Sequence, residues 1–187
     1  SNHVVLNNQG DSTPTLFLHG FTGTGDSWKE IVSKLDRFCI APDIVGHGKS
    51  SFNDIDSDYT IDDWCDDLSQ ILDSLKVDRL NICGYSMGGR LAISFASKYP
   101  DRIERLILES TSLGIKDNNA KKERYQEDLK LCKLIESDYS KFIRGWESSP
   151  LFLNQEERNK PAFLKQRKER LSHSPTQLSK ALEVFSQ

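Results

Sequence analysis

The stretch Leu80-Asn81-Ile82-Cys83-Gly84-Tyr85-Ser86-Met87-Gly88 decides the fold of this 187-residue chain. An apolar run precedes a serine that has a glycine two residues away on each side, and a helix-like stretch from Arg90 to Tyr99 follows. A nucleophile elbow requires this context, because a strand must turn sharply into a helix and side chains at the two glycines would clash. The turn is expected to expose the Ser86 hydroxyl at a helix N-terminus, where developing negative charge is favoured.

Strands and helices alternate on both sides of this elbow. We expect strands at residues 15–19, 38–42 and 103–108, and helices at residues 28–36 and 61–75. This alternation predicts an α/β fold with a mostly parallel sheet flanked by helices. Ligands of such sheets bind beyond the carboxyl ends of the strands. We therefore expect the site among Gly20, Asp43, Ser86 and Glu109, which all follow strand ends.

The composition of the chain changes near Ile115. Residues 1–114 are expected to form the core that holds the sheet. Residues 115–187 are highly charged and follow a helical period, as in Tyr139, Phe142, Ile143 and Trp146. We interpret them as a helical cap over the carboxyl edge of the sheet.

Composition argues against several classes of function. The net charge of −3 gives no basic field for nucleic acid or an anionic membrane, and no apolar run approaches the roughly 20 residues of a membrane span. No cluster has the spacing of metal ligands. The cysteines form no Cys-x-x-Cys pair and are interpreted as buried apolar residues in a reducing compartment: Cys39, Cys65, Cys83 and Cys132. We expect a small-molecule substrate, neither nucleic acid nor membrane as partner, and a cytoplasmic or organelle-interior location.

Chemistry at Ser86 needs oxyanion donors and a base. The backbone N–H of Met87, the residue after the serine, is the expected first donor, and the N–H of Phe21 in the loop after residues 15–19 is the second. The base is harder to find, because it should follow the serine and an acid in the chain. His173 is the only histidine after Ser86. We interpret it as a solvated histidine of a cap loop, with a catalytic role as the alternative.

The chain offers no well-placed acid either. Residues 103–108 have the aliphatic content of an interior strand, and as the last strand they would leave a long unpaired edge. We therefore expect further strands, carrying the acid and the histidine, to belong after Gln187. The chain alone is expected to be catalytically silent, since an unactivated serine hydroxyl is a poor base or nucleophile. His19 is expected to order the loop at Phe21 by hydrogen bonding.

With these motifs, the chain resembles the α/β-hydrolase superfamily and, within it, the family of 2-succinyl-6-hydroxy-2,4-cyclohexadiene-1-carboxylate synthases of menaquinone and phylloquinone biosynthesis. The similar segments span nearly the whole chain: Leu18-His-Gly-Phe-Thr-Gly, Asp43-x-x-Gly-His-Gly, Gly84-Tyr-Ser-Met-Gly-Gly-Arg90, Leu108-Glu-Ser-Thr-Ser-Leu-Gly114, Trp146, Pro150-Leu-Phe152 and Gln166-Arg-x-x-Arg-Leu-Ser172. The resemblance implies a lyase that eliminates pyruvate from 2-succinyl-5-enolpyruvyl-6-hydroxy-3-cyclohexene-1-carboxylate without a cofactor. Ser86 would then act as the base, activated by a histidine that this chain lacks.

The resemblance also implies carboxylate clamps at Arg90, Arg124 and Arg170 and pocket walls at Tyr85 and Trp146. A guanidinium group recognises a carboxylate through two parallel hydrogen bonds, which suits the polycarboxylate substrate that the resemblance implies.

The residues themselves leave alternatives to these roles. Arg90 lies one helical turn after Ser86 and fits a helix salt bridge equally well. The sequence alone favours a solvated face for Arg124 and a core position for Trp146. Spacing does not choose between Arg167 and Arg170.

Two other functions share the same elbow. One is an ordinary carboxylesterase or carbon–carbon bond hydrolase of the α/β-hydrolase superfamily. The other is a non-catalytic protein or fragment of this fold that binds a ligand or partner, which the absent acid and base favour. The oligomeric state does not follow from the sequence.

Overall fold

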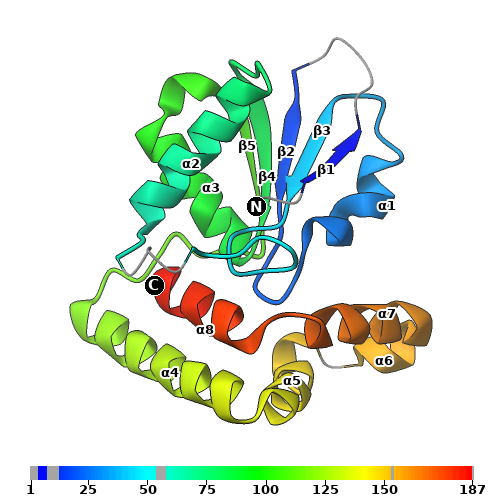
Figure 1. Ribbon diagram of the computed structural model, residues 1–187, viewed down its shortest axis with the longest axis vertical. Coiled ribbons are helices and arrows are strands. Elements are labelled where there is room, and N and C mark those ends of the chain that lie inside the picture. Colours follow the sequence, from blue (N-terminus) through cyan, green and yellow to red (C-terminus); the bar gives the residue numbers. More distant parts are fainter. Residues whose placement is uncertain (1–3, 8–12, 54–57, 153, 187) are drawn as a thin grey trace.

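The structure is a computed structural model that describes residues 4–7, 13–53, 58–152 and 154–186 (Figure 1). Within these residues, one sheet has the strand order β1-β3-β2-β4-β5. The strands are β1 (Val4–Asn7), β2 (Thr15–Leu18), β3 (Cys39–Pro42), β4 (Leu80–Tyr85) and β5 (Ile103–Glu109). β1 pairs with β3 in antiparallel fashion, and the other neighbours are parallel. The predicted, mostly parallel sheet is confirmed, and β1 is an antiparallel edge that the sequence analysis missed.

Helices cover both faces of the sheet. α2 (Ile61–Ser74) and α3 (Met87–Lys98) lie together on one side, and the short α1 (Lys29–Val32) lies on the other (Figure 1). α2 begins in a capping box in which the Thr60 hydroxyl accepts from the Asp63 N–H (3.2 Å). The helix expected at 28–36 is shorter than predicted. A 3₁₀ turn (Gly25–Trp28) precedes it, and after Val32 the chain continues in tighter i→i+3 hydrogen bonds.

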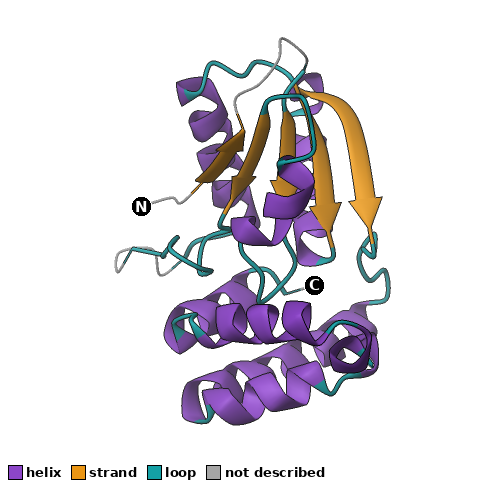
Figure 2. Cartoon of the chain, turned by 90° about the vertical axis from the view of Figure 1, so that its right-hand side faces the viewer, coloured by secondary structure: helices purple, strands orange, loops and turns teal. Residues whose placement is uncertain are grey.

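Among the described residues, five α-helices follow β5. They lie beyond the end of the sheet to which the parallel strands point (Figure 2). They are α4 (Asn118–Ser137), α5 (Tyr139–Glu147), α6 (Gln155–Arg158), α7 (Lys160–Leu171) and α8 (Pro175–Val184). The all-helical stretch expected after Ile115 therefore takes the position of a cap. A buried apolar cluster holds α4, α5 and α8 together: Cys132, Ile135, Phe142, Ile143, Leu178 and Leu182.

The main core lies between the sheet and its helices, and the cap contributes to it. Ala181 and Phe185, from the α8 segment, are buried in the same cluster as Leu16, Ile82 and Phe95. This segment thus packs on the core with one face and on α4 and α5 with another. All four cysteines are free thiols, as their spacing predicts.

β5 forms an edge of the sheet, because no described strand pairs with its outer side. Leu106, Ile107 and Leu108 are 38%, 52% and 37% exposed. Successive strand residues point to opposite faces, so apolar side chains are exposed on both faces of β5. A strand with interior composition thus occupies an edge position in the described structure.

Candidate active site

The Ser86 turn between β4 and α3 has the geometry that the sequence predicts. Ser86 has φ +53° and ψ −115°, a strained conformation for a residue other than glycine. Its N–H donates to the Glu109 carbonyl in β5 (2.9 Å), and its carbonyl accepts from the Gly89 N–H in α3 (3.0 Å). These hydrogen bonds hold the serine between the sheet and the first turn of the helix, with its side chain half-buried.

The two glycines of the motif are required by close backbone contacts. A Cβ atom on Gly84 would lie 2.6 Å from the Gly88 carbonyl oxygen. A Cβ atom on Gly88 would lie 2.6 Å from the His19 carbonyl oxygen and would also clash with the Leu18 carbonyl. The elbow therefore packs directly against the end of β2, and this packing brings the loop after β2 to the serine.

The loop after β2 forms a turn beside Ser86. The Gly23 N–H donates to the Gly20 carbonyl (3.0 Å), which closes a β-turn that we call the oxyanion turn (residues 20–23). A Cβ atom on Gly20 would lie 3.3 Å from the Ser86 Cβ, so the turn contacts the serine residue. Within the described ranges, neither the Phe21 N–H nor the Met87 N–H donates a hydrogen bond. Both predicted donors are thus available to an oxyanion.

His19 holds this turn in the way that the sequence analysis expects. Its Nδ1–H donates to the Gly20 carbonyl (2.9 Å), while its Nε2 accepts from the Ile44 N–H (2.9 Å). The backbone partners fix the tautomer, because a carbonyl only accepts and an amide only donates. The histidine is buried and joins the loops that follow β2 and β3.

His173 is buried, which corrects the interpretation of a solvated loop residue. Only 4% of it is exposed. Its Nε2–H donates to the Thr22 carbonyl (2.9 Å), and its Nδ1 accepts from the Gly48 N–H (3.0 Å). The loop between α7 and α8 is pressed against the core, and this contact between distant segments removes the side chain from water. Both ring nitrogens are occupied, and neither bonds to Ser86.

Three histidines pack in a row at this junction. The His47 ring lies between the other two, with centroids 5.1 Å from His19 and 5.6 Å from His173. Burial lowers the pKa of His19 from 6.5 to about 4, lowers the pKa of His47 well below its usual range, and lowers the pKa of His173. All three rings are therefore neutral near pH 7. Among the described residues, no histidine forms a hydrogen bond with the Ser86 hydroxyl.

Arg170 and Tyr85 line one pocket beside the oxyanion turn. The pocket has a volume of about 210 Å³ and is also bordered by Gly20, Phe21 and Phe152. The Arg170 guanidinium lies over the Phe152 ring, 4.8 Å from its centroid. This arrangement joins three of the predicted site residues, which come from the loop after β2, from β4 and from α7.

Glu147 in α5 contacts both Arg167 and Arg170, the two arginines that the sequence spacing leaves as alternatives for one site position. Its carboxylate pairs with Arg170 (3.2 Å) and with Arg167 (2.6 Å). The Arg170 side chain is 2% exposed, whereas that of Arg167 is 38% exposed and lines a different pocket. Burial lowers the pKa of Arg170, and the Glu147 carboxylate opposes this shift. Arg170 Nε is buried without a hydrogen-bond partner among the described residues.

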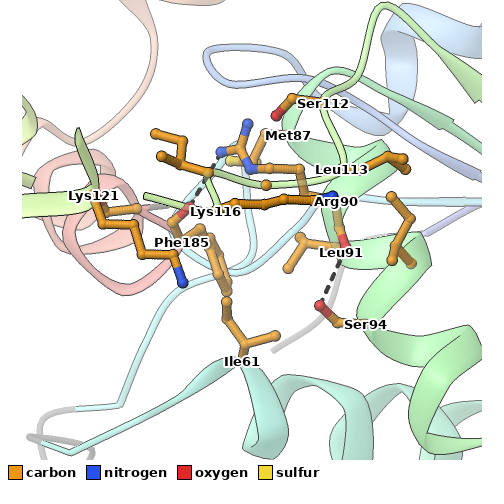
Figure 3. Close-up of a pocket in the computed structure, with 14 residues that line it drawn as sticks. Ile61, Met87, Arg90, Leu91, Ser94, Ser112, Leu113, Lys116, Lys121 and Phe185 are labelled. Atoms are coloured by element: carbon orange, nitrogen blue, oxygen red, sulfur yellow. Dashed lines mark hydrogen bonds between the residues drawn. The ribbon is translucent and has the colours of Figure 1, made fainter. Parts of the chain in front are cut away.

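Arg90 lines a separate pocket of about 310 Å³, together with Met87 (Figure 3). Its Nη2 donates to the Phe185 carbonyl (3.2 Å). Burial lowers the pKa of Arg90, and the nearby positive charge of Arg124 lowers it further. Arg124 is held by Asp128, whose carboxylate oxygens lie 3.0 and 3.1 Å from its Nε. Tyr85 borders the first pocket and Met87 the second, so Ser86 lies between the two in the chain.

Trp146 packs in a cluster of aromatic rings behind the oxyanion turn. Its ring centroid lies 5.5 Å from Phe21, 5.8 Å from Phe142 and 5.7 Å from Phe152. Its indole N–H is buried with no partner among the described residues. Trp146 is therefore a partly buried residue that packs against the cap cluster and supports two residues of the first pocket.

Two carboxylates, Asp128 and Glu147, orient the arginines and were not predicted from the sequence. Asp128 carries a local signal, because it lies four residues after Arg124 on one helix face. Glu147 carries none, since it is 20 and 23 residues away from the arginines that it binds. Within the described ranges, no group of three or more potential ligands is arranged to hold a metal ion. None of the described helices is long and apolar enough to cross a bilayer.

Comparison with known proteins places these features in a family. Residues 13–131 match the model of the alpha/beta hydrolase fold. A Bacillus subtilis protein with the provisional name 2-succinyl-6-hydroxy-2,4-cyclohexadiene-1-carboxylate synthase is 40% identical over 147 residues, which are 78% of this chain and 54% of that protein. Protein PHYLLO of Arabidopsis thaliana, a chloroplastic protein, is 31% identical over 172 residues, or 87% of this chain and 10% of its own length. The chain thus spans about half the length of the Bacillus relative.

A solved structure agrees with these matches. MenH from S. aureus superposes with a TM-score of 0.90 at 33% identity, over 97% of this chain and 70% of that one. Further hydrolase and esterase structures, at 16–24% identity, share the fold.

Proposed function

The chain belongs to the α/β-hydrolase family and, within it, to the MenH family, and from this premise we propose that it serves in a 2-succinyl-6-hydroxy-2,4-cyclohexadiene-1-carboxylate synthase. The reaction converts 2-succinyl-5-enolpyruvyl-6-hydroxy-3-cyclohexene-1-carboxylate into the cyclohexadiene and pyruvate, in menaquinone or phylloquinone biosynthesis. The names of the Bacillus relative and of the S. aureus structure support this assignment.

The chemistry is an elimination rather than a hydrolysis. A base removes a proton from a ring carbon, a new ring C=C bond forms as the existing one shifts, and the C–O bond to the enolpyruvyl group breaks. The enolate that leaves takes up a proton and becomes pyruvate. In this proposal Ser86 takes the ring proton after a histidine has activated its hydroxyl. The negative charge that develops next to the ring would be held by the N–H groups of Phe21 and Met87.

The observation that carries the proposal is a pair of arginine-lined pockets, each bordered by one of the two residues next to Ser86 in the chain. Arg170 borders the pocket with Tyr85, and Arg90 borders the pocket with Met87. The substrate carries carboxylates on the ring, on the succinyl group and on the enolpyruvyl group. Guanidinium groups at two separate places suit a ligand whose carboxylates lie at separate ends. A simple ester would need the elbow and the oxyanion donors but neither arginine.

The described residues supply the serine and the oxyanion donors but no base. The Ser86 hydroxyl has no hydrogen-bond partner within them. We therefore expect the 187-residue chain to bind the product and to leave the substrate unchanged, because an unactivated hydroxyl is a weak base.

Turnover provides the direct test. Formation of the conjugated diene would be followed by its ultraviolet absorbance for the 187-residue chain and for a chimera. In the chimera, the portion of S. aureus MenH outside the structural match is joined after Gln187. We expect turnover by the chimera only, and a loss of at least about a thousandfold in Ser86→Ala. Clear turnover by the 187-residue chain would contradict the expectation that it lacks a base.

Matched arginine variants separate the lyase from the alternatives. Arg90→Ala in the chimera is expected to raise KM about tenfold or more, because a charge-assisted hydrogen bond to substrate is lost. Arg144→Ala removes an exposed arginine of α5 and is expected to change nothing. Ester hydrolysis that is indifferent to Arg90→Ala would favour a carboxylesterase. Product binding without turnover by the chimera would favour a binding protein.

The cellular setting is part of the proposal. Bacterial relatives would place the reaction in the cytoplasm, and the chloroplastic Arabidopsis relative would place it in a plastid. The partner in either setting is the small polycarboxylate substrate.

A further inference from the structure

The oxyanion turn contains a strained residue. Thr22 has φ +66°, in the left-handed region that a β-branched side chain rarely adopts. A positive φ at the third residue of a β-turn is the type II arrangement, in which glycine normally occupies that place. Thr22 is 3% exposed and directly follows Phe21, the proposed oxyanion donor. The surrounding structure must hold this turn in a conformation that its own sequence disfavours.

The side chain that holds Thr22 comes from the cap. His173 donates from Nε2–H to the Thr22 carbonyl (2.9 Å) and accepts at Nδ1 from the Gly48 N–H (3.0 Å). One neutral imidazole therefore joins the strained turn to the loop after β3. The cap also packs the Trp146 ring against the Phe21 ring, with centroids 5.5 Å apart.

His173 is the middle member of a regular seam between cap and core. Glu169, four residues earlier, accepts hydrogen bonds from the hydroxyls of Thr24 and Ser27. Gln177, four residues later, accepts from the Phe52 N–H (2.7 Å). The seam binds the loops after β2 and β3 but makes no hydrogen bond to Ser86 within the described residues. Its position suits the alignment of the loops rather than proton transfer.

We infer that His173 is a positioning residue for the oxyanion hole: from the cap, it keeps the Thr22 turn in the strained form that presents the Phe21 N–H to Ser86. Docking of the α7–α8 segment and assembly of the hole are then one event. The purpose of the turn rests on the proposed function. The coupling between His173 and Thr22 is a property of the folded chain and is measured without turnover.

Hydrogen exchange of the Gly23 amide in the 187-residue chain tests this coupling by NMR. This amide closes the turn, so its exchange reports opening of the turn. His173→Ala is expected to speed the exchange about tenfold, the effect of one lost buried hydrogen bond. His173→Gln, whose amide both donates and accepts, is expected to restore most of the protection.

The decisive variant combines two substitutions. Glycine adopts a positive φ without strain. Thr22→Gly in the His173→Ala background is therefore expected to slow the exchange of Gly23 again. A merely structural role for His173 predicts no such rescue. If His173→Ala does not fold, His173→Phe keeps a ring in place without either hydrogen bond, and the same acceleration and rescue are expected.

Ile135→Ala provides the control for general loss of stability. Ile135 is buried in the cap cluster on α4, a helix without a hydrogen bond to the turn in the described structure. Equal acceleration by Ile135→Ala, or absence of rescue by Thr22→Gly, would overturn the inference. An inactive chimera with the coupling intact would refute the proposed function alone, and an active chimera without the coupling would refute this inference alone.

Discussion

The two halves of the candidate site are built in different ways. The core half, formed by the Ser86 turn and the oxyanion turn, consists of main-chain groups whose places are set by contacts between backbone atoms. The cap half, for which Arg124, Trp146 and Arg170 are the predicted residues, consists of side chains that ion pairs and aromatic rings hold in place. Local steric rules therefore fix the main-chain groups that are proposed to meet the reacting atoms. Packing between distant segments fixes the side chains that are proposed to meet the rest of the substrate.

The largest loss of stability is expected when a single methyl group is added to the core half. Gly88→Ala places a Cβ atom 2.6 Å from the His19 carbonyl oxygen, and neither backbone can yield without disturbing β2 or α3. We expect a loss of more than about 4 kcal/mol in the free energy of unfolding, or no folded protein. Urea denaturation followed by circular dichroism measures the change. A folded variant with near-normal stability would show that the elbow can accommodate an added methyl group.

This contrast explains what could be read from the sequence. The elbow and the parallel strands follow from a short motif and its flanking periodicity, and the same motif predicts the two oxyanion donors. β1 was not predicted because its four residues carry little periodic signal. The burial of His173 was not predicted because it depends on Thr22 and Gly48, which lie 151 and 125 residues away in the chain. The difference in burial between Arg170 and Arg167, which both pair with Glu147, likewise depends on packing between distant segments.

Low pH should destabilise the junction between the two halves, where three buried histidines pack. His19, His47 and His173 stay neutral in the folded chain because burial lowers their pKa values, whereas each ionises near pH 6.5 when unfolded. Below pH 6.5 the unfolded state binds more protons. The free energy of unfolding therefore keeps its maximum value above pH 6.5 and falls as the pH drops toward about 4, the pKa of His19. Between pH 7 and pH 5 we expect a loss on the order of 2 kcal/mol for each histidine that remains neutral.

Urea titrations at neutral and acidic pH test this expectation, and His173→Gln is the matched variant. Glutamine keeps a donor and an acceptor but cannot ionise. The change in the free energy of unfolding between pH 7 and pH 5 should therefore be smaller by the contribution of one histidine. The carboxylates of Asp43 and Glu169 favour the protonated rings and moderate the effect. A free energy of unfolding that does not change between pH 7 and pH 5 would contradict the assignment of neutral rings.

The cap half should depend on its buried carboxylate. Glu147→Gln removes the carboxylate that is paired with the Arg170 guanidinium, whose side chain is only 2% exposed. We expect a loss of about 3 kcal/mol in the free energy of unfolding, measured by urea denaturation. Asp128→Asn is the control, because Arg124 is 40% exposed and water can replace the lost carboxylate. A loss of about 1 kcal/mol is expected there. Equal losses would mean that burial of the arginine does not set the effect.

The smallest expected effect tests why the core half and the cap half respond differently to an added methyl group. Gly88 and Gly145 both lie inside helices, α3 and α5, where alanine is the better helix former by about 0.5–1 kcal/mol. A Cβ atom on Gly145 would meet no atom within 4 Å. Gly145→Ala is therefore expected to raise the free energy of unfolding by about that amount, measured by urea denaturation with an unchanged m value. Because helix propensity favours alanine at both positions, an opposite sign at Gly88 can come only from its contact with β2. Destabilisation by Gly145→Ala would mean that the cap is packed as closely as the elbow, and the distinction between the two halves would be lost.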